Sequence, residues 1–550
     1  MSRHTPHTSI GNLADLFETI AETIPDAPCL GTAGEKTKSW REVEERSTAL
    51  AQGLLESGLR TGEWVGLYMT NGHEYMESMI ACFKARLVPV NINYRYVADE
   101  LVSLFDDADL SGLIFEETYK EQAIHAALHL KNLHFLLQIG RKAAFPTENY
   151  FSVEDSLPTY ENLISDHYGA SLDVERSPDD LYVLYTGGTT GRPKGVLWRQ
   201  EDIFYGALAG ALERPAPRTL KQAAEMSRTS STIGFPAPPY MHGTAHWFGF
   251  WCLFDGGMVT CTRGEGFDPV LFWEICEREH VTHAAIVGDS FARPLIEAWD
   301  TANGYDVSLT FLLSGGALLS PTTKKALRDR LPDVNIADGL GTSESGGIGR
   351  AGQENRFRAG RSVRVLGDDG AFLPPGSRES GRIAKTGRIP LGYHKDPERT
   401  AKTFPTIEGR RWVVAGDRAH LHADGMIELL GRGSSSINSG GEKIYPEEVE
   451  AAVLAHPDIA DVLVVGIPSE QWGEAVTAVV APKLGTIEYG SISIDDIREC
   501  CRERLARYKW PKFLVVVPNI QRSPAGKPDY EWARIQAITT LKTERKQPKK

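Results

Sequence analysis

The feature that most constrains the fold is a repeated alternation of short strand-like runs with longer helical runs across much of the chain. The strand-like runs are rich in β-branched and aromatic residues, and the runs between them carry apolar residues at helical spacing. The clearest strands are residues 63–68, 111–115, 181–185, 283–287 and 309–313, and the clearest helices are 75–85 and 270–280. Because parallel strands need crossover connections, this order predicts an α/β fold with mostly parallel, buried sheets.

The last part of the chain has a different pattern, which predicts a second, smaller domain. A polar Gly/Ser run at 433–441 is typical of a hinge, and a compact α+β unit follows it. The unit is predicted as helix 446–456, strands 461–467 and 474–482, helix 493–508 and strand 513–518. We therefore predict a large N-terminal region of several subdomains at 1–431, a hinge at 432–441, a small mobile domain at 442–537 and a basic tail at 538–550. A further polar stretch, 213–232, is predicted to be a mobile loop.

Composition excludes several classes of protein. The 60 lysines and arginines against 73 acidic residues give a net charge of −13, which argues against general binding of nucleic acid. The seven cysteines are scattered, with no CxxC pair, so neither a zinc site nor a disulfide framework is expected. The N-terminus lacks the apolar stretch of a signal peptide, and no apolar run reaches the roughly 18 residues of a membrane span. These observations predict a cytoplasmic protein.

The strongest chemical signal is the run YTGGTTGRPKGV, from Tyr185 to Val196. Its glycines let the backbone approach a ligand, three threonine hydroxyls can donate hydrogen bonds, and Arg192 and Lys194 add positive charge. A phosphate loop of the Walker A type is excluded, because Lys194 follows a proline and precedes a glycine. The run therefore predicts a cradle for a polyphosphate, between the strand at 181–185 and a helical run at 202–212.

The same run resembles the phosphate loop of the adenylate-forming superfamily, which contains acyl-CoA synthetases, luciferases and adenylation domains. Four more segments resemble motifs of this family and occur in the family's order. They are SGGAL at 314–318, LGTSES at 340–345, GDRAHLHADGMIELLGR at 416–432 and PAGKPDY at 524–530. The resemblance covers essentially the whole chain, and it implies an enzyme that uses ATP, Mg²⁺ and CoA.

The resemblance also implies a role for each motif residue. Glu344 and Thr190 would hold Mg²⁺, Asp417 and Arg432 would contact the ribose, and Lys527 would stabilise the attack of a carboxylate on the α-phosphorus. Gly440, Gly441 and Glu442 would serve the second half-reaction, after rotation of the small domain. The remaining nucleotide contacts would come from Thr186, Gly187, Gly188, Thr189, Thr190, Gly191, Lys194, Ser314, Gly315, Gly316, Ala317, Leu340, Gly341, Thr342 and Ser343.

Two departures from the family pattern stand out. The family usually places an aromatic residue over adenine where this chain has Leu340, so adenine would pack against an aliphatic side chain. The hinge usually carries an acidic or basic residue where Ser434 and Ser435 follow Arg432 and Gly433, which leaves the pivot residue open.

The segment PPYMHGTAHWFGFWCLF at 238–254 bears on which carboxylic acid is the substrate. It resembles another motif of the family, in which His242 has the characteristic position near the reacting carboxylate. Its aromatic residues predict either a buried helix start or an apolar acyl pocket, and it offers no acidic residue to hold the ammonium group of an amino acid. The motif set looks most like bacterial acyl-CoA synthetases that include sterol side-chain ligases. A steroid side-chain acid and an ordinary fatty acid therefore remain the two candidate substrates.

Two other functions stay open at this point. One is transfer of the acyl group to the phosphopantetheine arm of a carrier protein instead of CoA. The other is a catalytically silent protein that binds a nucleotide or an acyl group, against which Glu344 and Lys527 argue. The sequence leaves a homodimer open as an alternative to a monomer.

Overall fold

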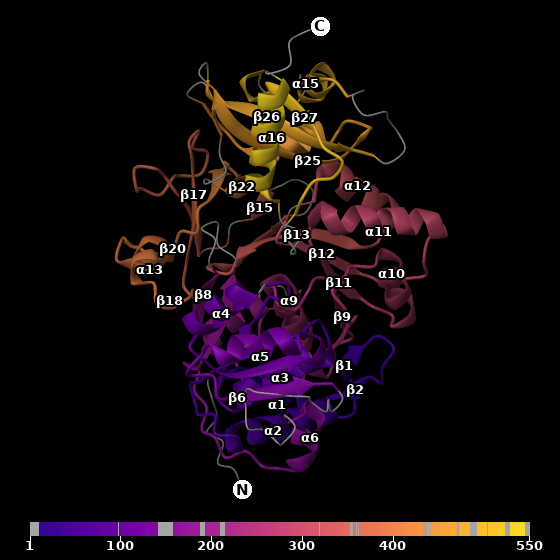
Figure 1. Ribbon diagram of the computed structural model, residues 1–550, viewed down its shortest axis with the longest axis vertical. Coiled ribbons are helices and arrows are strands. Elements are labelled where there is room, and N and C mark those ends of the chain that lie inside the picture. Colours follow the sequence, from indigo (N-terminus) through magenta and orange to yellow (C-terminus); the bar gives the residue numbers. More distant parts are fainter. Residues whose placement is uncertain are drawn as a thin grey trace.

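The computed structural model describes the chain except for residues 1–9, 97, 141–157, 187–192, 210–214, 318, 352–355, 359, 361, 433–436, 440–441, 470–471, 484–491, 503, 506, 523–527 and 545–550. The described strands form four sheets. Figure 1 shows the N-terminal segments at one end of the molecule and the C-terminal unit at the other, with β12 and β13 between them. The predicted α/β class and the smaller C-terminal α+β unit are confirmed.

The first part of the chain forms a parallel sheet in the order β4-β3-β5-β6. The strands are β3 (Trp64–Tyr68), β4 (Val88–Asn91), β5 (Leu110–Glu116) and β6 (Phe135–Ile139). The helices of this part are α1 (Leu13–Thr23), α2 (Trp40–Glu56), α3 (His73–Lys84), α4 (Ala98–Asp107), α5 (Lys120–Leu128) and α6 (Tyr160–Asp166). Every residue of α3 is buried, including Glu74, Glu77 and Lys84, because the helix packs against α1 and α2. The strands predicted at 63–68 and 111–115 and the helix predicted at 75–85 are therefore confirmed.

The largest sheet contains a parallel half whose strand ends carry two of the motifs. Its parallel strands are β1 (Pro28–Thr32), β10 (Met258–Cys261), β9 (Ile233–Pro236), β11 (His283–Ile286), β12 (Phe311–Gly315) and β13 (Asn335–Thr342), with β2 (Lys38–Ser39) antiparallel at the edge. Its helices are α9 (Gly243–Phe254), α10 (Pro269–Arg278), α11 (Gly288–Ala302) and α12 (Pro321–Arg330). Ser314 on β12 lies opposite Asp338 on β13, so the two motif-bearing strand ends are neighbours. Carboxyl ends of parallel strands are where α/β proteins place ligands.

Beyond β13 the same sheet continues with antiparallel strands, which the strand–helix alternation does not predict. They are β14 (Gly346–Ala351), β15 (Arg356–Arg358), β22 (Met426–Arg432), β21 (Asp417–Leu421), β17 (Ser380–Thr386), β20 (Arg410–Val413) and β19 (Thr406–Ile407), and β16 (Val363–Leu366) pairs with β17. Through this half, Asp417 is brought opposite Arg432.

The secondary structure that follows the phosphate loop differs from the predicted one. It joins β7 (Leu181–Thr186) to an antiparallel partner, β8 (Lys194–Arg199), so that Thr186 lies opposite Lys194. The loop does follow the predicted strand and precede helical residues, but the prediction missed β8, which pairs with β7 before α7 (Gln200–Ile203) begins. The run predicted as a helix from 202 continues as a single π-helical stretch, Phe204–Leu208. The third strand of this sheet is β18 (Gly392–Tyr393), which leads into α13 (Pro397–Thr403).

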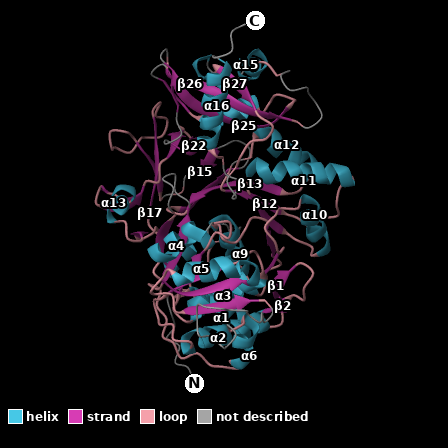
Figure 2. Cartoon of the chain, viewed as in Figure 1, coloured by secondary structure: helices cyan, strands magenta, loops and turns pink. Residues whose placement is uncertain are grey.

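The C-terminal unit packs three helices against a five-stranded sheet. The strands are β23 (Ile437–Ser439), β24 (Glu442–Ile444), β25 (Ile459–Ser469), β26 (Gly473–Pro482) and β27 (Phe513–Val516). The helices are α14 (Pro446–Val453), α15 (Ile494–Arg502) and α16 (Tyr530–Glu544). Figure 2 shows α16 lying across this sheet, where Ala533 and Ala537 are buried. Because α16 runs on to Glu544, the first residues of the segment predicted as a basic tail are helical.

Two other predicted segments differ from the structure. The helix predicted at 493–508 ends at Arg502, and a short 3-10 turn follows at Arg507–Lys509. The predicted mobile loop at 213–232 contains α8 (Leu220–Ser227), which Thr219 caps and which packs against α1 with Ala223 buried. The polar composition concealed this helix, since only one narrow face is apolar. Within the described ranges, no helix has the length and apolar content needed to cross a bilayer.

Candidate active site

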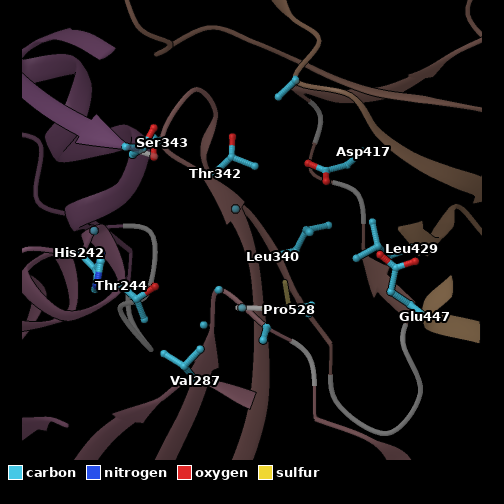
Figure 3. Close-up of a pocket in the computed structure, with 18 of the residues that line it drawn as sticks. His242, Thr244, Val287, Leu340, Thr342, Ser343, Asp417, Leu429, Glu447 and Pro528 are labelled. Carbon is cyan, nitrogen blue, oxygen red and sulfur yellow. The ribbon is translucent and has the colours of Figure 1, made fainter. Parts of the chain in front are cut away.

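A cavity of about 1720 Å³ lies where the parallel strand ends, the β7–β8 sheet and the C-terminal unit meet. Figure 3 shows His242 and Thr244 on one side, Asp417, Leu429 and Glu447 on the other, and Leu340 between them. Residues of the phosphate-loop strands, of both β12 and β13 ends and of α14 and α16 all line it. Motifs that lie far apart in the sequence therefore share one space.

The end of β12 forms a tight turn that faces the cavity. The Ser314 hydroxyl donates to the carbonyl of Ala317 at 2.8 Å and accepts from the Gly288 amide at 2.9 Å. Gly316 has a φ of 84°, which a residue with a side chain rarely adopts, and a Cβ at Gly315 would lie 2.8 Å from the Thr244 side chain. Because these glycines have no side chain, the space beside the turn stays open. This is the space that was predicted to receive a nucleotide, next to Ser314, Gly315, Gly316 and Ala317.

The end of β13 forms a second turn, which presents Glu344. Thr342 and Ser345 close it through reciprocal bonds, in which the Thr342 amide donates to the Ser345 hydroxyl and the Ser345 amide to the Thr342 hydroxyl, both at 3.1 Å. The Trp198 indole nitrogen donates to the Ser343 carbonyl at 3.0 Å. Leu340, Gly341, Thr342, Ser343 and Glu344 all line the cavity. Leu340 itself is only 8% exposed and packs with Phe357 and Ile427, so the surface at the position predicted to face adenine is aliphatic.

Glu344 is oriented by a residue that the sequence analysis missed. The Tyr393 hydroxyl donates to Glu344 Oε1 at 2.8 Å. Burial, reinforced by the negative charge of Glu344, raises the pKa of Tyr393 to about 12, so the phenol remains a donor at neutral pH. A carboxylate is a suitable ligand for Mg²⁺, which takes few protein ligands when phosphates complete its coordination. The described residues contain no cluster of three or more metal-ligating side chains.

Lys385 fixes the same turn from behind. Its ammonium group donates to the carbonyls of Ser345 and Gly347, both at 2.7 Å, and to that of Gly206 at 3.4 Å. Burial lowers the pKa of Lys385 to about 8, since the charge lies away from water. The sequence offered only a weak signal for it, a lysine on the same strand face as buried Ile383.

The described ends of the phosphate loop lie in the cavity wall. Thr186 and Lys194 line the cavity, and Lys194 Nζ lies 3.4 Å from Asp396 Oδ2. Gly187, Gly188, Thr189, Thr190, Gly191 and Arg192 lie outside the described residues. The hairpin is joined to the His242 segment by Asn91, whose side-chain amide donates to the carbonyls of Tyr185 at 2.8 Å and Met241 at 2.7 Å. Asn91 was also missed, because nothing in its local sequence marks it.

Asp417 is buried in the wall opposite His242 and is the described part of the predicted ribose site. Arg432 lies opposite it in the β21–β22 ladder, and Glu442 begins β24, but the side chains of both lie outside the description. Gly440, Gly441 and Lys527 are also outside the described residues. Pro528, which follows Lys527 directly, lines the cavity and lies near its centre in Figure 3.

The aromatic segment contributes one apolar wall. His242 precedes α9 and lines the cavity together with Met241, Trp247, Phe248 and Trp251. Two other aromatic residues of the segment lie in the core: Tyr240 packs against Tyr75, and Phe250 against Phe83 and Phe254. The buried helix start is therefore present, and an acyl pocket at the cavity wall stays a prediction.

Trp247 is held in place by a chain of buried hydrogen bonds. Its indole nitrogen donates to the Tyr182 hydroxyl at 2.7 Å, and this hydroxyl is hydrogen-bonded to His246 Nε2. His246 Nδ1 lies 2.6 Å from the carbonyl of Tyr240 and so carries the proton. Burial lowers the pKa of His246 to about 4, which keeps this histidine neutral.

Two models of known protein families match this chain and together cover most of its length. The model described as AMP-binding enzyme matches residues 17–388, and the model described as AMP-binding enzyme C-terminal domain matches residues 448–527. A 3-oxocholest-4-en-26-oate–CoA ligase of Rhodococcus rhodochrous is 39% identical over 545 residues, with 96% of each chain covered. A medium/long-chain-fatty-acid–CoA/3-oxocholest-4-en-26-oate–CoA ligase of Mycobacterium marinum is 39% identical over 544 residues, again with 96% of each covered.

Solved structures show the same fold. The crystal structure of the anthranilate CoA ligase AuaEII in complex with anthranoyl-AMP superposes with a TM-score of 0.81, covering 96% of this chain and 98% of that one. At 20% identity this likeness concerns the fold alone.

Proposed function

Because the chain belongs to the AMP-binding enzyme family, we propose that it joins a hydrophobic carboxylic acid to CoA with ATP, through an acyl-adenylate. The observation that carries this proposal is the single cavity in which Lys194, Glu344 and Asp417 face an apolar wall formed by residues such as Met241 and Trp247. A polar nucleotide and an apolar acid can meet there. Both relatives named above are CoA ligases for 3-oxocholest-4-en-26-oate, and the second is also one for medium- and long-chain fatty acids, which supports a bulky or long aliphatic acid as the substrate.

The first half-reaction needs an oriented carboxylate and a restrained polyphosphate. We assign Thr186 and Lys194 to the phosphates, together with Gly187, Gly188, Thr189, Thr190 and Gly191 of the loop, Asp417 with Arg432 to the ribose, and the turns at 314–317 and 340–343 to the base. Glu344, with Thr190, would hold Mg²⁺, which when bound neutralises phosphate charge. His242 would lie next to the acid, and Lys527 would stabilise the charge that develops as the carboxylate attacks.

The second half-reaction needs the small domain in another position. We propose that the chain divides into an adenylation region at 1–431, a hinge at 432–441 and a mobile domain at 442–537. Gly440, Gly441 and Glu442 would then approach the adenylate while CoA attacks it. We propose a cytoplasmic location, which the free cysteines among the described residues support.

The direct test is a panel of steroid side-chain, fatty and amino acids, scored by AMP release with and without CoA. We expect acid-dependent AMP release that requires CoA for turnover. Release with a carrier protein but not with CoA would select the carrier-protein alternative, and no release with any acid would leave the silent binding protein.

The variant Lys527→Ala separates the two half-reactions. We expect loss of adenylate formation, because the ammonium group beside the attacking oxygen is gone, while thioester formation from preformed acyl-adenylate continues. Equal loss of both half-reactions would contradict the role given to Lys527.

A further inference from the structure

Arg399 is a cationic residue of the cavity that lies outside every motif considered so far. It lies on α13 and lines the same cavity as Lys194 and Glu344. Its guanidinium carbon lies 5.0 Å from the centre of the Tyr393 ring. The hydrogen bond from the Arg399 amide, together with the charges of Lys194 and Arg399, lowers the pKa of Asp396, so one carboxylate is shared by the two cations of the cavity wall.

Two hydrogen-bonded connections place Arg399 between the phosphate loop and Glu344. On one side, Asp396 accepts from the Arg399 amide at 3.0 Å through Oδ1, and its Oδ2 lies 3.4 Å from Lys194 Nζ. On the other side, the ring beneath the guanidinium belongs to Tyr393, whose hydroxyl donates to Glu344. The two cations and the carboxylate therefore belong to one connected group.

Strand pairing and hydrogen bonds hold the backbone around Arg399 in place. Tyr393 is paired with Val196 of β8, the strand that carries Lys194 at its start. Thr400 accepts from the Tyr393 amide at 2.9 Å and donates to the Asp396 carbonyl at 2.7 Å. A side chain supported in this way loses little further freedom when it binds an anion.

We propose that Arg399 binds the β- and γ-phosphates of ATP, and hence the pyrophosphate that leaves. The proposal rests on the proposed function, in which this cavity holds ATP. When the carboxylate oxygen bonds to the α-phosphorus, the bond from that phosphorus to the bridging oxygen breaks and its electron pair passes to pyrophosphate. A guanidinium group suits this leaving group, because its planar fork donates two parallel hydrogen bonds to phosphate oxygens and keeps its charge at every assay pH.

The test compares two nucleotides that differ in the phosphates concerned. Calorimetric titration of the full chain with Mg·ATP and with AMP is carried out on the wild type, Arg399→Ala and Arg399→Lys. We expect Arg399→Ala to weaken Mg·ATP binding by about 10- to 100-fold and to change AMP binding by less than about twofold, as loss of a charge-assisted contact to phosphate predicts. Arg399→Lys should weaken Mg·ATP less, since it keeps the charge and loses the fork.

Arg364→Ala is the matched control. Its guanidinium carbon also stacks on aromatic rings, 5.1 Å from Phe372 and 5.8 Å from Trp412, but Arg364 is not part of the cavity wall. It should bind both nucleotides as the wild type does. Unchanged Mg·ATP affinity in Arg399→Ala, an equal loss for AMP, or a wild type that binds neither nucleotide would each overturn the proposal.

Kinetics separate this inference from the proposed function. In acid-dependent ATP–pyrophosphate exchange, Arg399→Ala should raise the KM for pyrophosphate, while thioester formation from preformed adenylate stays at the wild-type rate. If no acid supports AMP release but the Mg·ATP-specific loss is observed, the proposed function fails and the phosphate contact stands. If AMP is released normally and the variant binds Mg·ATP like the wild type, the contact fails and the function stands.

Discussion

Removing one oxygen atom, in Tyr393→Phe, tests whether Glu344 must be held in place for adenylation. The ring that supports Arg399 and the packing of this 7% exposed residue remain, while the 2.8 Å hydrogen bond to Glu344 is lost together with the contacts of the hydroxyl to Thr403 and Arg399. A hydrogen bond to a charged group contributes about 1.5–3 kcal/mol, which corresponds to roughly 10- to 150-fold in a rate or an affinity. We expect a decrease of that size in adenylate formation and a higher Mg²⁺ concentration for half-maximal rate.

The assay is ATP–pyrophosphate exchange measured across a series of Mg²⁺ concentrations, with thioester formation from preformed adenylate measured in parallel. Tyr168→Phe is the matched control, because its hydroxyl also bonds a carboxylate, that of Glu45, but Tyr168 is 58% exposed and lies away from the cavity. The control should behave as the wild type in both half-reactions. An unchanged Mg²⁺ dependence in Tyr393→Phe, or an equal decrease in both half-reactions, would refute the reasoning.

Two further predictions concern buried polar groups. Burial, reinforced by Glu447, raises the pKa of Glu450 to about 8. Between about pH 4.5 and 8 the unfolded chain has therefore lost this proton while the folded chain keeps it, so the free energy of unfolding should fall by up to about 1.4 kcal/mol for each unit by which the pH rises. Glu450→Gln should make this decrease less steep in thermal melts. A slope equal to that of the wild type would contradict it. Tyr182→Phe removes the hydroxyl to which both Trp247 and His246 are hydrogen-bonded. The free energy of unfolding should fall by about 2–6 kcal/mol, and the melting temperature with it. The preference among acids should also change, because Trp247 lines the cavity. A melting temperature and an acid preference both unchanged would show that the chain of bonds is dispensable.

The parts of the fold that could be predicted are those whose periodicity is local. The strands at 283–287 and 309–313 appear as β11 and β12, because continuous apolar runs bounded by helices are typical of a buried parallel sheet. The antiparallel half escaped prediction because β14 is rich in glycine, β15 is three residues long and β19 only two, so their pairing depends on other strands rather than on their own sequence pattern. The hairpin around the phosphate loop escaped for the same reason, since β8 pairs across the loop rather than within its own run.

The residues of the candidate site also fall into two groups, one that the sequence predicts and one that it does not. Family membership, confirmed by the matched models, came from motifs whose described residues line the cavity. The residues that hold those motifs in position, such as Asn91, Trp198 and Tyr393, act across large separations in sequence, and their local surroundings resemble ordinary core. Chemistry that is concentrated in one segment can be recognised from the sequence, whereas support that is assembled by the fold cannot.

Lys385 shows why that support matters for catalysis. Its ammonium group joins Gly206, in the π-helical stretch that lines the cavity, to Ser345, the residue next to Glu344. The acceptors are backbone carbonyls, so the buried ammonium group connects the Gly206 segment of the cavity wall directly to the backbone of the turn that carries Glu344. The position of Glu344 relative to that wall therefore depends on Lys385, which lies on a different strand.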